Sequence, residues 1–163
     1  MATSLEELRV LRDAETLADG IWQHVVLWES FAREVVGKQL AEAADSIGAN
    51  IAEAFGRFHY AEKIHHLYYA RGSLFETKYW LNRALTRELM PSAEAEKYSA
   101  RLTDIARQLN AFVSKLKTQR HDDQTATKSS SLHDARAEYT VEILDEPLFT
   151  DDELLWLETI ATL

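Results

Sequence analysis

The sequence predicts an all-α protein, and three observations lead to this fold class. Apolar residues recur every three or four positions along most of the first 120 residues, which is the period of an α-helix. The 163 residues include only five glycines and two prolines, too few for the many turns of an all-β protein. Breaks in the apolar pattern are short, so we expect an antiparallel, up-down four-helix bundle.

Four apolar stripes mark the four expected helices. They cover residues 17–28, 36–55, 64–85 and 98–116. The third stripe contains two charged members, Arg71 and Lys78, in positions that face the core. The fourth stripe alternates steps of four and three residues, like the seam of a coiled coil.

Three breaks separate the stripes. The first lies near residues 31–37 and is weak. The second is Gly56, which we expect just beyond the end of a helix, where glycine adopts the left-handed conformation. The third is Met90-Pro91-Ser92, because proline and serine suit a helix start. We therefore place the bundle at residues 1–120.

The charge sets the last part of the chain apart. Residues 1–120 contain equal numbers of basic and acidic side chains, so the net charge of −9 comes from residues 121–163. Residues 121–134 are polar and rich in Ser and Thr, which predicts a linker. Residues 135–163 form an acidic arm, in which 139–144 alternate weakly as a strand would.

The acidic arm is expected to end in a short helix at about residues 151–162. Thr150 and Glu153 have the spacing of a capping box. A helix this short is unstable alone in water. We therefore expect the arm to bind a protein partner, or the bundle itself, through its apolar side chains Phe149, Leu154, Trp156, Leu157 and Ile160.

Several classes of protein are disfavoured by composition. The chain has no cysteine, which excludes disulfides and thiol nucleophiles and suits a reducing cytoplasm. Its charged N-terminus does not read as a signal peptide. No apolar run approaches the roughly 20 residues of a membrane span, so we expect no membrane contact.

Two segments resemble a known family. They are SIGANIAEAFGR at residues 46–57 and ARGSLFET at residues 70–77. They are similar to the four-helix bundle proteins encoded in 23S rRNA intervening sequences, a family that includes the accessory variability protein of diversity-generating retroelements. The resemblance covers about residues 14–117. Ala41 and Glu42 stand where the family often has two basic residues, which weakens the inference of nucleic-acid binding.

The resemblance implies a non-enzymatic homo-oligomer, a pentamer, with a possible RNA or DNA partner. The retroelement relatives bind a reverse transcriptase and nucleic acid through basic surfaces. We accordingly expect a scaffold or adaptor, accessory to a nucleic-acid-processing partner such as a reverse transcriptase. The alternative is a protein-directed assembly module of a defence or mobile-element operon that does not bind nucleic acid.

The polar residues of the two motifs suggest a structural network. Asn50 and Glu53 are neighbours on one helix face, and Arg71 lies on the core stripe of the next helix. A buried arginine requires a partner, so we expect Arg71 to pair with Glu53, with Asn50 beside it. A ligand site is the alternative, but no nucleophile or base accompanies the three residues.

Metal and catalytic sites are not expected. Glu62-x-x-His65 matches one of the two such units that di-iron bundles use, and the second unit is missing. His59, Glu62 and His66 could share a helix face, but a fourth zinc ligand is not evident. We expect no catalytic residue, metal or cofactor, and a metal-dependent enzyme is the third choice.

Two further surfaces are predicted from residue type. Tyr68, Gly72, Phe75 and Tyr79 form a second stripe beside the core stripe, which predicts a subunit interface or, alternatively, a wide core face. Basic residues that could meet phosphates, or simply be solvated, are Arg57, Lys63, Arg83, Arg87, Lys115, Lys117 and Arg120. The acidic arm could also cover such a basic surface and compete with nucleic acid.

Overall fold

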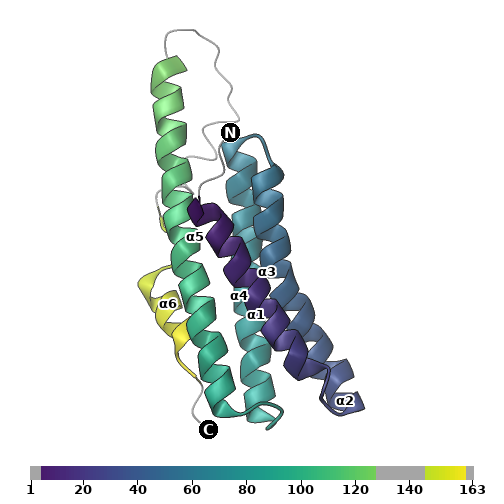
Figure 1. The fold of residues 1–163 in the computed structure, drawn as a ribbon. Helices are drawn as coiled ribbons and strands as arrows, with labels where there is room; N and C mark the ends of the chain where they lie inside the picture. The colour runs from purple at the N-terminus through teal and green to yellow at the C-terminus, as the bar shows by residue number, and fades with distance from the viewer. Residues whose placement is uncertain (1–4, 128–145, 161–163) are drawn as a thin grey trace.

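A computed structural model describes residues 5–127 and 146–160, and Figure 1 shows its fold. Every regular element within these ranges is helical, which confirms the all-α prediction. The elements are α1 (Leu5–Val25), α2 (Ser30–Ala32), the π-helical turn η1 (Arg33–Gly37), α3 (Lys38–Gly56), α4 (Tyr60–Thr86), α5 (Ser92–Thr127) and α6 (Asp151–Glu158). The strand considered at 139–144 lies outside the described residues.

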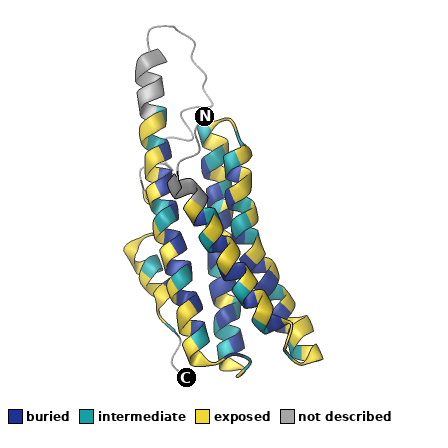
Figure 2. Ribbon diagram, viewed as in Figure 1, coloured by how far each residue is buried: buried dark blue, intermediate teal, exposed yellow. Residues whose placement is uncertain are grey.

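The long helices α1, α3, α4 and α5 lie side by side, and the chain reverses direction at each connection between them (Figure 1). α1 packs on α3 and α5, and α4 packs on the same two helices, so the four close a ring. Buried residues, coloured dark blue, recur along all four long helices (Figure 2). The fully buried core includes Leu17, Leu40, Ile51, Leu74 and Leu102. None of the described helices combines the length and the apolar character needed to cross a membrane.

The first break in the bundle lies earlier than we predicted. α1 ends at Val25, residues 26–29 form the turn, and α2, η1 and α3 then follow one another without leaving the helical conformation. Gly37 therefore lies inside a helix and does not end one. A β-carbon at this position would lie 2.7 Å from Val25 Cγ1, so glycine here allows α1 and its turn to approach closely.

The two helix ends around α4 also differ from the prediction. Gly56 is the last residue of α3, and the chain leaves the helix through the extended Arg57, so the predicted left-handed glycine cap is wrong. The left-handed residue is Glu88, with φ of 56°. The Glu88 and Leu89 amides bond to Leu85 and Ala84 carbonyls at 3.0 and 2.9 Å, which is a Schellman motif.

The C-terminal part of the chain contains more helix than expected, and its last described residues pack against the bundle. α5 continues to Thr127, so it passes residue 120 and occupies half of the predicted linker at 121–134. α6 begins with the capping box of Thr150 and Glu153. It packs against α5, so residues 146–160 are part of the bundle's surface and not a separate unit.

Candidate functional site

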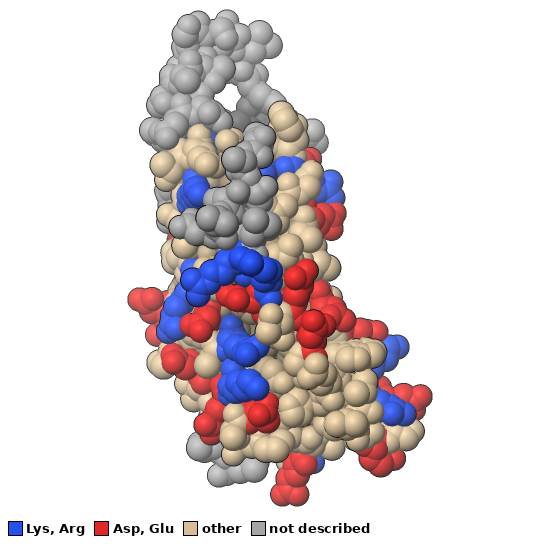
Figure 3. Space-filling view, viewed as in Figure 1, with Lys and Arg blue, Asp and Glu red and all other residues tan. Residues whose placement is uncertain are grey.

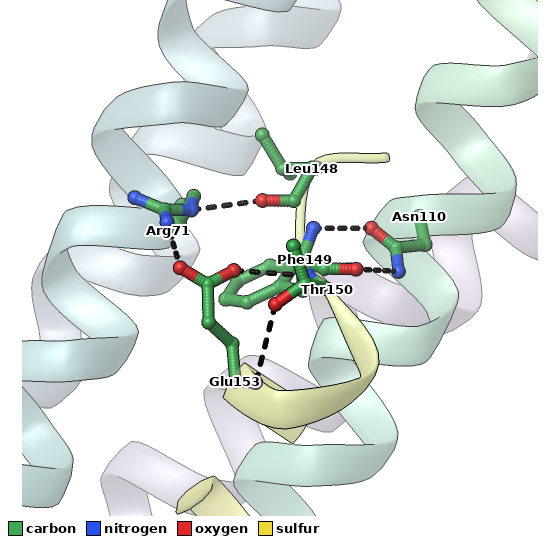
Figure 4. Close-up of polar contacts among 6 residues, drawn as sticks. All are labelled: Arg71, Asn110, Leu148, Phe149, Thr150 and Glu153. Carbon is green, nitrogen blue, oxygen red and sulfur yellow. Dashed lines mark hydrogen bonds and ion pairs between the residues drawn. The ribbon is translucent and has the colours of Figure 1, made fainter. Parts of the chain in front are cut away.

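Residues 146–160, here called the docked arm, pack against both α4 and α5 (Figure 4). The surface of these two helices that the arm covers is here called the groove. Leu148, Phe149 and Leu157 are almost completely buried in it. Leu154 and Ile160 are half-buried against the same core, whereas Leu155 and Trp156 stay 63% and 43% exposed. The arm thus binds the bundle itself, which is one of the two modes expected from the sequence.

Asn110 of α5 binds the main chain of one arm residue twice. Its Nδ2 donates to the Phe149 carbonyl at 2.8 Å, and its Oδ1 accepts from the Phe149 amide at 2.7 Å (Figure 4). A side-chain amide can bond both main-chain groups of a residue because it carries one acceptor and two donors. These two bonds fix the position of the chain just before α6 begins.

Arg71 of α4 holds the arm from the opposite side of the groove. Its Nε donates to the Leu148 carbonyl at 2.8 Å, and its Nη2 pairs with Glu153 (Figure 4). Glu153 also accepts from the Thr150 amide at 2.9 Å, so one carboxylate completes the capping box and meets Arg71. The guanidinium lies 4.9 Å from the centre of the Phe75 ring, within the range of a cation–π contact.

Phe75 of α4 contacts the arm through its aromatic ring. Its ring stacks on Phe149 and Trp156, with centroid distances of 5.9 and 5.5 Å. Offset stacking of this kind adds about 0.5–1.5 kcal/mol per pair beyond simple burial. The side chain that we assigned to a subunit interface therefore packs against the arm of its own chain.

Lys78 lies fully buried beneath the end of the arm. Its Nζ donates to Ser99 Oγ at 2.7 Å and to the Thr159 carbonyl at 2.8 Å. Among the described residues no carboxylate forms an ion pair with it. Burial disfavours the charged amine and lowers the pKa of Lys78 from 10.5 to about 8.

The predicted pairing of Arg71 with Glu53, with Asn50 beside it, is wrong. Glu53 pairs with Arg57 four residues along, and Asn50 donates to the Ser46 carbonyl at 2.8 Å. Arg71 faces the other side of α4, where the arm supplies its partners. The local helical spacing could not show this contact, because Glu153 is 82 residues away in the chain.

The other members of the second α4 stripe are only partly covered. Tyr79 is 52% exposed, Tyr68 is half-buried, and no other described part of the chain lies within 4 Å of the place where a Gly72 β-carbon would be. Among the described residues, Gly72 and Tyr79 leave room for a further contact. Their role in a subunit interface stays a prediction.

The candidate basic residues lie toward two ends of the bundle. Arg83 and Arg87 are at the end of α4, about 30 Å of helix from Lys63 at its start. Lys115, Lys117 and Arg120 follow Phe112, which stacks on Phe55 near the end of α3, so they lie toward the same end as Arg57 and Lys63. On the face drawn in Figure 3, Lys and Arg side chains lie close to Asp and Glu side chains.

The histidines early in α4 have partners of other kinds. His65 bonds to the Tyr69 hydroxyl at 2.8 Å, and His66 Nε2 lies 3.6 Å from Glu53. Across the residues that the structure describes, no group of three or more histidines and carboxylates is arranged to hold a metal ion.

An exposed apolar surface at the turn after α1 was missed in the sequence. We call it the turn patch, and it consists of Trp22, Val26, Leu27, Phe31 and Val35, which are 57%, 38%, 84%, 72% and 44% exposed. A groove of about 390 Å³ beside it is lined by Trp22 and Val26 and rimmed by charged side chains such as Arg33 and Lys38. The signal was present in the run VVLWESF at residues 25–31, which has more apolar residues than a short turn needs.

Comparison with known proteins gives one result that bears on identity. A family model described as 23S rRNA-intervening sequence protein matches residues 6–111, which span α1 to the middle of α5. The matched region contains Asn110 and Arg71 but ends before the docked arm. No curated protein matches the chain.

Proposed function

Because the chain belongs to the 23S rRNA-intervening sequence protein family, we propose that it is a non-enzymatic scaffold built from several copies of itself. The observation that carries the proposal is the turn patch, in which Leu27 and Phe31 are 84% and 72% exposed. Several exposed large apolar side chains within one short stretch of chain are typical of protein interfaces. We therefore assign the turn patch, rather than Phe75, to contact between copies.

A pentamer is the assembly that the family resemblance suggests. Burying a leucine or phenylalanine side chain contributes about 1.5–3 kcal/mol, and closing a ring repeats the contact on every copy. We propose a cytoplasmic location, supported by the absence of cysteine.

The oligomeric state of the full-length chain tests this proposal. Native mass spectrometry and light scattering should give a mass near five times 18.6 kDa. The double variant Leu27→Ser/Phe31→Ser should dissociate, whereas the matched control Leu155→Ser, which changes an exposed leucine of α6, should not. A wild-type monomer at tens of micromolar would rule out the scaffold.

In its more specific form, the proposal is that the scaffold binds nucleic acid as an accessory protein of a partner such as a reverse transcriptase. Its support is the set of basic residues toward one end of the bundle: Arg57, Lys63, Lys115, Lys117 and Arg120. In a ring, each residue is repeated around the axis, and multivalency amplifies weak contacts.

Salt-dependent binding of single-stranded RNA and DNA distinguishes the two forms of the scaffold. Binding that weakens between 50 and 200 mM salt, and that Lys63→Glu/Arg120→Glu abolishes, would support the phosphate-binding form. Arg83→Glu/Arg87→Glu, at the other end of α4, is the control of equal charge. Absence of binding at low salt would leave the protein-directed assembly module.

A further inference from the structure

The groove between α4 and α5 bonds the main chain of the docked arm in addition to burying its apolar side chains. Four bundle side chains donate to arm carbonyls at 2.7–2.8 Å: Arg71 to Leu148, Lys78 to Thr159, Asn110 to Phe149 and Lys117 to Glu146. Asn110 also accepts from the Phe149 amide. Helices of one bundle usually meet through interdigitated apolar side chains, whereas bonds to the main chain are a means of holding a bound peptide.

The groove also selects side chains at defined positions. It buries the consecutive Leu148 and Phe149, and it places Arg71 where a glutamate four residues after Phe149 can reach it. That glutamate must be the third residue of a helix begun by Thr150, because the capping box positions its carboxylate. The chemistry that fits is Leu-Phe-Thr-x-x-Glu at the start of a helix.

The connection between the bundle and the arm is long enough for the arm to leave. Asn110, which holds Phe149, is about 26 Å of helix from Thr127 at the end of α5. The 18 residues 128–145 can span at most about 60 Å, more than twice that distance. The family match ends at residue 111, so it includes α4 and α5 as far as Asn110, but neither Lys117 nor the arm.

We propose that this groove is a binding site for a helix start of the pattern Leu-Phe-Thr-x-x-Glu in a partner protein, and that residues 146–160 occupy it as an exchangeable intramolecular ligand. Because the arm and the groove belong to one chain, a partner segment must compete with an intramolecular ligand, so it binds when it is present in several copies or is held nearby. Displacement frees the arm and its exposed Leu155 and Trp156. This inference is separate from the scaffold role, because a single chain is sufficient to bind the segment.

Peptide binding to the full-length chain tests the proposal. The probe is a fluorescein-labelled peptide of residues 145–160, measured by anisotropy. Leu148→Ala/Phe149→Ala removes the anchors of the resident arm and leaves the groove intact, so this variant should bind the peptide at least tenfold more tightly than wild type. Adding Asn110→Ala to the anchor variant Leu148→Ala/Phe149→Ala should abolish peptide binding. Adding Ser114→Ala instead, at an exposed position one turn further along α5, should leave peptide binding unchanged. A peptide with Glu153→Gln should bind at least threefold more weakly.

Three results would overturn the proposal. One is equal binding to wild type and to the anchor variant, and another is binding that Asn110→Ala leaves unchanged. The third is an oligomer of the wild-type chain that the Phe149→Ala variant does not form. That result would show that the groove binds the arm of a second copy.

Hydrogen exchange on the wild-type protein provides an independent check if the anchor variant fails to fold. Amides of α6 should exchange at least a hundredfold faster than amides in the middle of α4 and α5, because the arm opens locally. Excess peptide should leave the α4 and α5 rates unchanged. Equal protection of α6 and the bundle would show that the arm is an integral part of the core and would refute exchange.

Discussion

Replacing Lys78 with methionine tests the electrostatic cost of an amine buried between the bundle and its arm. Lys78 Nζ has two neutral acceptors, Ser99 Oγ and the Thr159 carbonyl, and no carboxylate partner among the described residues. A neutral amine still has two N–H donors, so it can make both bonds without the cost of a buried charge. Methionine retains much of the apolar stem and removes the titration.

The sign of the pH dependence follows from the pKa of Lys78, about 8 in the folded chain against 10.5 as the ordinary value. Between these two pH values the unfolded chain binds a proton that the folded chain has released. Stability therefore rises with pH in this window, and the penalty is fully present below pH 8. Linkage gives a gain of about 1.3 kcal/mol between pH 7 and pH 9, and the full difference corresponds to about 3 kcal/mol.

The assay is urea unfolding of wild type and Lys78→Met at pH 7 and pH 9. Taking the difference between the two proteins at each pH removes the contribution of all other titrating groups. The free energy of unfolding of wild type, relative to the variant, should be about 1.3 kcal/mol higher at pH 9. A difference that changes by less than about 0.3 kcal/mol would refute the reasoning. Phe149→Ala should abolish the pH effect, because release of the arm exposes Lys78 to water.

Four further predictions concern the backbone and the pairing of Arg71 with Glu153. Gly37→Ala should lower the free energy of unfolding by about 1–3 kcal/mol, because its β-carbon would lie 2.7 Å from Val25 Cγ1. Gly72→Ala, at a mid-helix site where the described residues leave open space, should raise the free energy of unfolding by about 0.5–1 kcal/mol, and an unchanged or lower value would place a neighbour at this face. Glu88→Gly should raise the thermal midpoint, with a gain of about 1 kcal/mol, because φ at this residue is 56°. A double-mutant cycle of Arg71→Leu and Glu153→Gln in urea should give a coupling of about 0.5–1 kcal/mol, reduced by solvent at this partly exposed pair, and additivity would contradict the ion pair.

The helices could be predicted from the sequence because their signals are local. The apolar period identifies α3, α4 and α5, and the spacing of Thr150 and Glu153 identifies the start of α6. The first turn was misplaced for a physical reason. Gly37 suggested a break, but it permits close packing inside a helix, and Trp28 fits the apolar stripe although it lies in the turn itself.

The candidate site was harder to predict, because the contacts between the bundle and the arm join residues 29 to 82 positions apart. Arg71 and Lys78 were visible as charged residues on a core stripe, which shows that each needs a partner. Helical spacing in the sequence suggested only the nearby carboxylate of Glu53 as a partner for Arg71, and it suggested no partner for Lys78. Apart from Ser99 of α5, which bonds to Lys78, the partners Leu148, Glu153 and Thr159 lie beyond the end of α5, so only the docking of the arm identifies them.

The arm and the turn patch lie on opposite sides of the bundle, as α6 and α2 do in Figure 1. Assembly through the turn patch would therefore leave the groove accessible to a partner segment. Assembly through the α4 stripe would instead compete with the arm for Phe75, which stacks on Phe149 and Trp156. The two arrangements differ in the effect of Phe149→Ala on oligomer mass. We expect Phe149→Ala to leave the oligomer mass unchanged. If release of the arm strengthens assembly instead, the subunit interface is the stripe of Tyr68, Gly72, Phe75 and Tyr79.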